Sequence, residues 1–173
     1  MSFNNFTGRI PAQIGNLTML KRLLLGANSF EGTIPEEISN LPNLQFLALQ
    51  GDNLIGNIPP AIFNMSTLTE ISLPSNQLTG SLPSSIGLGL PNLERLYLGG
   101  NFLSGKIPSS ISNASKLVEL DFGINAFSGY IPRKLGSLRN LESLSLAEND
   151  FTAESSTSEL SIIKYLTNCK YLR

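Results

Sequence analysis

Few residues in this sequence are of types that support catalysis, and their spacing does not group them. The chain of 173 residues has no histidine, which excludes every catalytic triad, proton shuttle or zinc site that depends on imidazole. The single cysteine, Cys169, stands at a position of the sequence pattern where an earlier part of the chain has an apolar residue, Leu41. A buried small apolar side chain is therefore favoured over a reactive thiol. We predict no catalytic residue and no cofactor.

Three other features have residue types found in ligand sites. Gly87-Leu-Gly89 is too short for a phosphate-binding loop and precedes no helical pattern. Glu36-Glu37 follows a proline on the expected outer side, where solvated carboxylates are the default. Asp52 would serve a metal only if several oxygen ligands converged on it, and none is evident. We therefore predict no metal site.

The totals exclude further classes. With 12 Lys+Arg against 13 Asp+Glu, the chain lacks the basic excess expected of a protein that binds nucleic acid or an anionic membrane. The start, MSFNNFTGRIP, has no basic segment followed by an apolar run, so we predict no signal peptide. No apolar run is long enough to span a membrane. Such signals in a longer protein would lie outside this segment.

An internal repeat determines where the side chains of the chain are placed. The segment Asn28-Ser-Phe-Glu-Gly32-Thr-Ile34-Pro35 recurs from residues 4, 52, 76, 101 and 125, and a further unit begins at Asn149 without the G-x-I-P element, all at intervals of 24 or 25 residues. An L-x-x-L-x-L pattern precedes these markers, as at Leu20, Leu23 and Leu25. Its last two leucines are two residues apart, so on a strand they face the same side. Each unit is therefore predicted to be a short strand followed by a tight turn, stacked on its neighbours.

The first residue of the marker has a structural role. An amide side chain both donates and accepts hydrogen bonds, so a buried asparagine can satisfy backbone groups of its own coil and of the next. We expect a ladder of stacked asparagines, with Asp52 as a weaker rung because a carboxylate lacks the amide donors. The ladder residues are Asn4, Asn28, Asn76, Asn101, Asn125 and Asn149.

The composite L-x-x-L-x-L-x-x-N-x-[LF]-x-G-x-[IL]-P resembles the plant-specific leucine-rich repeat, over residues 1 to about 151. Receptor-like kinases, receptor-like proteins and secreted polygalacturonase inhibitors carry such repeats. The extra residue in Ser85-Ile-Gly-Leu-Gly-Leu-Pro91 and the segments Asn149-Asp-Phe-Thr-Ala and Leu166-Thr-Asn-Cys169 resemble the receptor-kinase subgroup that holds immune receptors.

The resemblance implies an α/β repeat solenoid. We expect a right-handed superhelix with a parallel β-sheet on its concave side and short 3-10 or irregular segments on its convex side. The repeats would occupy residues 1–151, with an incomplete first coil in which Met1 takes the slot of Leu25. Residues 152–173 would form an irregular loop and a short helix from about Glu159, leading into a truncated repeat. The cysteine-bearing cap of the family is missing, so we expect a fragment or a short isoform.

The resemblance also implies extracellular display, N-glycosylation, and a peptide or protein ligand with a leucine-rich-repeat co-receptor as a further partner. The alternation along the strands places a varied set of side chains on the concave face. Aromatic and arginine side chains often anchor interfaces. The expected ligand-binding residues are Phe46, Glu70, Arg95, Tyr97, Glu119 and Asp121. The alternative is a solvated sheet face on which an aromatic side chain is merely tolerated.

Four N-x-S/T sequons are candidate glycosylation sites, conditional on secretion: Asn5, Asn16, Asn64 and Asn113. The last three lie 12 residues after a marker, on one ridge away from the concave sheet. The alternative is that this slot simply favours asparagine, since Asn40 fills it without a sequon.

The sequence thus favours the extracellular ligand-recognition module of a plant receptor-like kinase, in defence or developmental signalling. The alternative is a secreted inhibitor of a cell-wall-degrading enzyme, like the polygalacturonase inhibitors. An enzyme is the third class, and the chain offers no catalytic constellation for it. A membrane span and a kinase following this segment would exclude the inhibitor.

Overall fold

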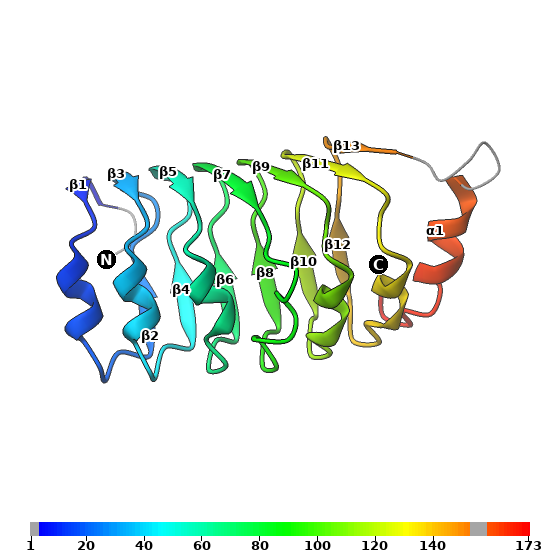
Figure 1. The fold of residues 1–173 in the computed structure, drawn as a ribbon, viewed down its shortest axis with the longest axis horizontal. Coiled ribbons are helices and arrows are strands. Elements are labelled where there is room, and N and C mark those ends of the chain that lie inside the picture. Colours follow the sequence, from blue (N-terminus) through cyan, green and yellow to red (C-terminus); the bar gives the residue numbers. More distant parts are fainter. Residues whose placement is uncertain (1–3, 153–158) are drawn as a thin grey trace.

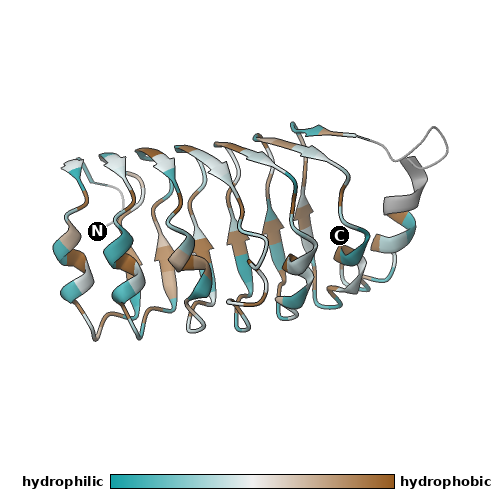
Figure 2. Cartoon of the chain, viewed as in Figure 1, coloured by the Kyte–Doolittle hydropathy of each residue, from teal (hydrophilic) through white to brown (hydrophobic). Residues whose placement is uncertain are grey.

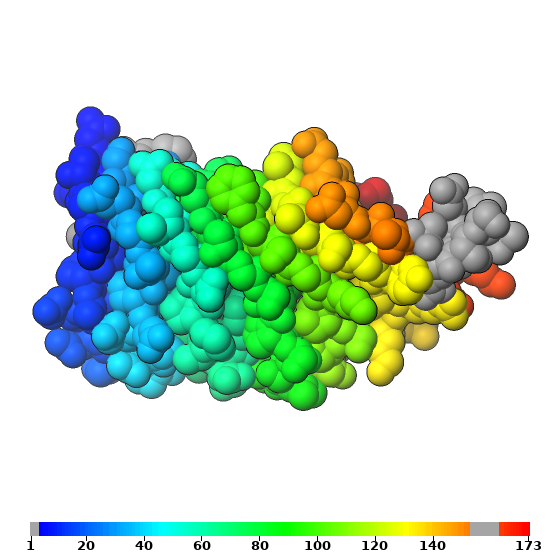
Figure 3. All heavy atoms as spheres, turned by 45° about the horizontal axis from the view of Figure 1, so that its top comes forward, coloured from blue at the N-terminus to red at the C-terminus, as the bar shows by residue number. Residues whose placement is uncertain are grey.

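The computed structural model describes residues 4–152 and 159–173, and it shows a stack of similar coils (Figure 1). Each coil runs through a strand of one sheet, a strand of a second sheet and a short helical turn before it enters the next coil. Figure 3 shows the coils as parallel stripes in sequence order, so each coil contacts chiefly its two neighbours. The α/β repeat solenoid predicted from the sequence is confirmed.

The L-x-x-L-x-L segments form a six-stranded parallel sheet. Neighbouring strands pair in chain order with equivalent residues opposite each other, so that Leu47, for example, lies opposite Ile71. This register keeps all inward-facing residues on one side. The strands are β2 (Arg22–Leu24), β4 (Phe46–Ala48), β6 (Glu70–Ser72), β8 (Arg95–Tyr97), β10 (Glu119–Asp121) and β12 (Ser143–Ser145).

The marker segments form a second, seven-stranded parallel sheet, which we did not predict. The sequence pattern indicated only a turn, because six of the seven segments contain a glycine followed by a proline three residues later. The glycines lie within or beside these strands with positive φ, for example 86° at Gly80, a conformation that glycine adopts at little cost. The strands are β1 (Thr7–Arg9), β3 (Ser29–Thr33), β5 (Asn53–Asn57), β7 (Gln77–Ser81), β9 (Phe102–Gly105), β11 (Ala126–Gly129) and β13 (Asp150–Phe151).

Short 3-10 helices lie on the convex side, each preceded by a proline whose fixed φ suits a helix start. The coil between β7 and β8 has turns at residues 84–88 in their place, where the sequence carries its extra residue. The helices are η1 (Ala12–Asn16), η2 (Glu36–Asn40), η3 (Pro60–Asn64), η4 (Ser109–Asn113), η5 (Arg133–Ser137) and the α-helix α1 (Glu159–Leu166).

The core runs the length of the stack. Leu47, Leu49 and Ile71 are fully buried, and the same slots are buried in coil after coil. Figure 2 shows hydrophobic segments recurring at the same place along the six-stranded sheet. Cys169 lies in this core, and burial raises the pKa of its thiol, although the charge of Arg139 lowers it. Neither Met1 nor residues 153–158 are among the described residues, so the expected slot of Met1 and most of the expected loop lie outside them.

Ladder asparagines join successive coils through their amide groups. The Oδ1 atom of Asn101 accepts the Leu78 N–H at 3.0 Å, and its Nδ2 atom donates to the carbonyls of Leu73 at 3.1 Å and Leu98 at 3.0 Å. Asn76, Asn125 and Asn149 repeat this arrangement. Asn28 accepts the N–H of Phe6 and donates to the carbonyl of Leu25 in its own coil. Asn4 is exposed at the first coil and donates its backbone N–H to the carbonyl of Ala27.

A second asparagine ladder, which we did not predict, follows another edge of the coils. Asn43 and Asn92 each donate their side-chain amide at 2.9 Å to a carbonyl of the preceding coil, and Asn140 does so at 3.3 Å. Each of these residues stands immediately before the first leucine of a triplet. That recurrence is the signal that would have revealed the ladder.

Candidate ligand-binding face

The six strands β2 to β12 present every second side chain away from the core, on the face we call concave. Because the strands pair in register, residues of equivalent slots stand side by side. Glu70 lies opposite Arg95, and Arg95 lies opposite Glu119. Tyr97 lies one pair further along, between Ser72 and Asp121. Phe46 lies opposite Glu70 on the N-terminal side.

Arg95 is the centre of a polar cluster. Its Nε atom lies 3.4 Å from Oε1 of Glu119, and its Nη1 atom lies 3.9 Å from Oε2 of Glu70. The Tyr97 hydroxyl donates to Oε2 of Glu119 at 2.7 Å. The side chains of Arg95, Glu70 and Glu119 are 38%, 27% and 37% exposed, so the cluster is accessible from solvent. The four residues thus form a connected, partly exposed polar surface across β6, β8 and β10.

The cluster changes the acidity of Tyr97. Burial is the largest cause, and the hydrogen bond to Glu119 and its negative charge add to it, so the pKa of Tyr97 lies well above its usual value. The charge of Arg95 opposes this shift only in part. Tyr97 is therefore a neutral hydroxyl at ordinary pH, and it holds the Glu119 carboxylate in a fixed orientation.

Phe46 belongs to a separate contact. The guanidinium of Arg22 lies 4.3 Å from the centre of the Phe46 ring, within the range of a cation–π interaction. Arg22, on β2, is the residue of the preceding coil that is equivalent to Phe46, and it lies opposite Phe46 in the sheet. The structure therefore divides the six predicted residues into Phe46, which pairs with Arg22, a polar cluster of four residues around Arg95, and Asp121 beside that cluster.

Asp121 connects the cluster to a hollow at the carboxyl end of the strands. Its Oδ1 atom accepts the N–H of Gly123 at 2.9 Å. A Cβ atom at Gly99 would come within 2.6 Å of Oδ2 of Asp121, so the absence of a side chain there leaves room for the carboxylate. The hollow has a volume of about 280 Å³. Its lining residues are Pro74, Ser75, Gly99, Gly100, Asp121, Gly123, Ile124, Ser145, Ala147 and Glu148.

Three further residues contribute to the concave face and were not among the predicted ligand-binding residues. Arg22 lies on the Phe46 ring, and Glu94 places Oε2 3.8 Å from Nη1 of Arg95. Glu148 lines the hollow beside Asp121. Arg22 could have been found from its concave slot and its 24-residue spacing from Phe46. Glu94 and Glu148 lie beyond the ends of the strands, where alternation carries no information.

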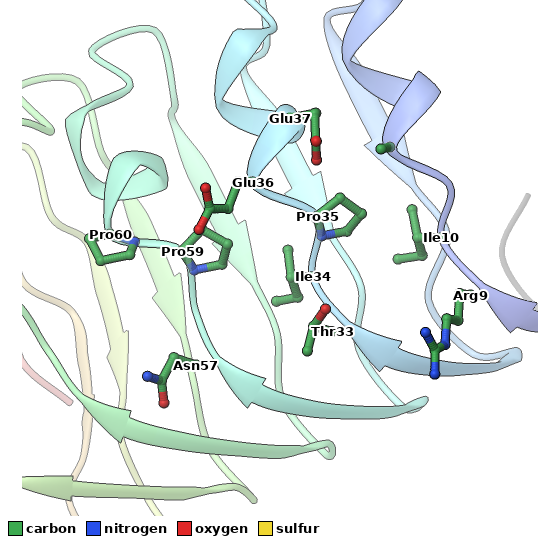
Figure 4. A pocket seen from close by; sticks show the side chains of 11 residues that line it. Arg9, Ile10, Thr33, Ile34, Pro35, Glu36, Glu37, Asn57, Pro59 and Pro60 are labelled. Atoms are coloured by element: carbon green, nitrogen blue, oxygen red, sulfur yellow. The ribbon is translucent and has the colours of Figure 1, made fainter.

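A larger surface groove of about 490 Å³ lies elsewhere, between the seven-stranded sheet and the convex helices (Figure 4). Its lining comes from three successive coils and includes Arg9, Glu36, Glu37 and Asn57. The prolines Pro35, Pro59 and Pro60 form much of its wall, as Figure 4 shows. None of the residues expected to bind ligand is among those that line it.

The four sequon asparagines are exposed. Asn16, Asn64 and Asn113 are the last residues of η1, η3 and η4, so they lie along one ridge on the convex side. Asn5 precedes β1 in the first coil. None of the four lies on a strand of the six-stranded sheet.

Within residues 4–152 and 159–173, no group of three or more His, Cys, Asp or Glu side chains is arranged to hold a metal ion. No helix in this part of the chain is long and apolar enough to cross a membrane.

Comparison with known proteins identifies the repeats. Models of the leucine-rich-repeat family match residues 19–41, 67–88 and 91–151, which together are more than half of the chain. No protein of curated function matches the sequence.

Solved structures extend the similarity. The plant peptide hormone receptor RGFR1 in complex with RGF2 superposes with a TM-score of 0.90 at 36% identity, covering 98% of this chain and 26% of that one. The Arabidopsis receptor kinase HAESA, in complex with the peptide hormone IDA and the co-receptor SERK1, gives 0.87 at 35%, covering 97% and 27%. A plant ice-binding protein gives 0.76 at 32%, covering 84% and 46%.

The chain thus spans about a quarter of the two receptor chains. The matched receptors are in complex with their ligands. The ice-binding protein shows that coils of a similar kind also occur in a protein with a different function. Repeat length, paired parallel sheets and asparagine ladder all agree with the family match. The chain belongs to the leucine-rich-repeat family, and its repeats are of the plant receptor-kinase ectodomain type.

Proposed function

We propose that the chain is part of the extracellular ligand-recognition module of a plant receptor kinase, and that it binds a peptide or protein along the concave face. The observation that carries this proposal is the cluster in which Arg95 joins Glu70 and Glu119. Its polar groups are already oriented by one another, and they lie beside an exposed sheet surface. Groups ordered before binding lose little further conformational entropy when a ligand arrives.

Receptors of similar structure support the class of ligand. RGFR1 is a peptide hormone receptor in complex with RGF2, and HAESA is in complex with the peptide hormone IDA and a co-receptor. By this likeness we infer a peptide ligand and a leucine-rich-repeat co-receptor for the protein to which this chain belongs. Extracellular display and glycans on Asn5, Asn16, Asn64 and Asn113 fit the same proposal, because these exposed residues leave the concave face open. We place the chain itself outside catalysis; phosphate transfer by the purified chain would contradict this.

A binding screen with matched variants tests the proposal. The purified chain is titrated with a panel of synthetic secreted plant peptides, and the affinity of any binder is measured by calorimetry. Phe46→Ala and Tyr97→Ala remove the two concave aromatic side chains. Loss of an interface anchor costs more than about 1 kcal/mol, or about fivefold in affinity.

The controls remove aromatic side chains of the same type elsewhere. Phe102, at the start of β9, is 63% exposed, and Tyr130, just after β11, is 51% exposed. Phe102→Ala and Tyr130→Ala should leave the affinity unchanged. Equal binding by both concave variants and the parent chain would place the ligand on another face.

A further inference from the structure

Asp52 stands in a ladder position that is asparagine in every other coil, and the residue is only 8% exposed. In the next coil, Asn76 shows what this position requires. Its Oδ1 atom accepts the N–H of Leu54 at 3.1 Å. Its Nδ2 atom donates to the carbonyls of Leu49 at 2.8 Å and Leu73 at 3.2 Å. Each rung therefore needs one atom that accepts and one atom that donates.

Asp52 supplies only the acceptor. Its Oδ1 atom accepts the N–H of Asn28 at 3.0 Å and the N–H of Phe30 at 3.2 Å. Its Oδ2 atom therefore takes the place of the amide Nδ2. This atom is buried and has no hydrogen-bond partner within the part of the chain that the structure describes.

The surroundings of Oδ2 follow from the repeat. Asn76 donates to carbonyls that lie 27 and 3 residues before it, so the equivalent carbonyls at Asp52 are those of Leu25 and Leu49. A carbonyl oxygen only accepts hydrogen bonds. A carboxylate oxygen without a proton would face these carbonyls with charge of the same sign and no donor between them, which is costly in a buried position.

We propose that Asp52 holds a proton on Oδ2 in the folded chain and donates it to a backbone carbonyl at this joint. The proton completes the ladder between the coils that contribute β3 and β5. The joint is therefore tight while the proton is bound and weaker once the proton is lost as pH rises.

Charged groups on the strands around this joint have other partners or directions. On β3 the titratable residue is Glu31, which is exposed. Arg22 on β2 lies over the Phe46 ring, and Glu70 on β6 lies near Arg95. The strands β4, β5 and β7 carry no titratable side chain. Proton binding at Asp52 is thus governed by burial and by backbone groups.

The electrostatics agree with this geometry. Burial raises the pKa of Asp52, and the N–H groups of Phe30 and Asn28 lower it by less. A pKa that is higher in the folded chain than in the unfolded chain means that the folded chain binds the proton more tightly. The resulting stability is fully present below about pH 3.9, the pKa of an unfolded aspartate, and is lost as pH rises through the higher folded value.

The direct test is a carbon-13 NMR titration of the aspartate carboxyl groups in the full chain. The sequence has three aspartates, Asp52, Asp121 and Asp150, so the signal of Asp52 is assigned by its absence in Asp52→Asn. We expect Asp52 to titrate clearly above the usual aspartate range. A titration midpoint at or below about 3.9 overturns the proposal.

Denaturant unfolding between pH 4 and 8 gives a second readout. Relative to the parent chain, Asp52→Asn should gain stability as pH rises, by up to about tenfold in the folding equilibrium for each pH unit between the two pKa values. Asp150→Asn, at an exposed aspartate, should show no such change. Asn76→Asp should introduce the same pH dependence one coil further on. A stability difference for Asp52→Asn that is the same at every pH contradicts the proposal.

Discussion

At the scale of single residues, the ladder asparagines show how few side chains determine the joints between coils. Asn101 is 5% exposed, and its amide serves an N–H group and two carbonyls at distances of 3.0–3.1 Å. These backbone groups have no access to water. The side chain is therefore required for satisfying the buried backbone, whereas the leucines around it contribute through burial alone.

Asn101→Ala should destabilise the chain by about 1–3 kcal/mol, because it leaves the Leu78 N–H and the carbonyl of Leu73 buried without this partner. Denaturant unfolding at constant pH measures the loss. Asn53→Ala, at an exposed residue of β5, should change the stability by less than about 0.5 kcal/mol. Equal losses in the two variants would show that the ladder amide contributes nothing specific.

Tyr97 provides a residue-scale test of the polar cluster. Its pKa is raised by burial and by Glu119, so the folded chain retains the phenol proton above about pH 10, where an unfolded tyrosine has lost it. Stability linked to Tyr97 is thus present below about pH 10 and is lost as pH rises further. An ultraviolet titration of the four tyrosines should show one late transition, which Tyr97→Phe removes. Glu119→Gln should move that transition toward lower pH.

At the scale of elements, the distance between coils is set where backbones touch. Gly87 lies in the turn that replaces a 3-10 helix, and a Cβ atom there would come within 1.8 Å of the Ser110 carbonyl oxygen. Gly89 has a similar approach on the other side, 2.2 Å from the Phe63 carbonyl oxygen. The segment Gly87-Leu-Gly89, which we excluded as a phosphate-binding loop, thus allows three coils to stack closely because its glycines have no side chains.

Gly87→Ala should therefore push the next coil away and destabilise the chain by about 1–3 kcal/mol, a typical cost of overpacking. The backbone of Ser110 cannot rotate aside as the end of a long side chain could. Leu88→Ala is the matched control, because Leu88 is adjacent in sequence and 69% exposed. Thermal unfolding of both variants measures the difference. A Gly87→Ala variant as stable as Leu88→Ala would mean that the coils separate at no cost.

The sequence predicted those elements in which apolar residues recur at the period of the secondary structure. The leucine triplets indicated the six-stranded sheet, because burial on one face requires their alternation. The second sheet was missed, since Gly80 and its equivalents hold positive φ in segments that resemble turns. The alternation of side chains along the strands was enough to predict which residues lie on the concave face. Their division into a Phe46–Arg22 pair and an Arg95 cluster depends on side-chain reach across strands, which alternation does not encode.

At the scale of the whole molecule, the stack separates two faces with different surfaces. The strands β6, β8 and β10 carry the polar cluster. The sequons Asn16, Asn64 and Asn113 lie at the ends of convex helices. Glycans on this ridge would extend away from the six-stranded sheet. A glycan placed on that sheet would instead cover the proposed ligand-binding face.

The sequence allows such a glycan with one substitution. Glu70→Asn creates the sequon N-I-S with Ile71 and Ser72, at the centre of the concave face. When the chain is produced in a secretory host, this variant should gain one glycan by mass and lose measurable binding to a peptide found in the screen. The double variant Glu70→Asn with Ser72→Ala has the same residue at position 70 but no sequon, so it separates glycan shielding from the loss of the Glu70 charge. Binding that survives a fully occupied glycan at this position would mean that the ligand uses the seven-stranded sheet or the convex side, because a glycan on β6 leaves no room for an extended peptide across β4 to β10.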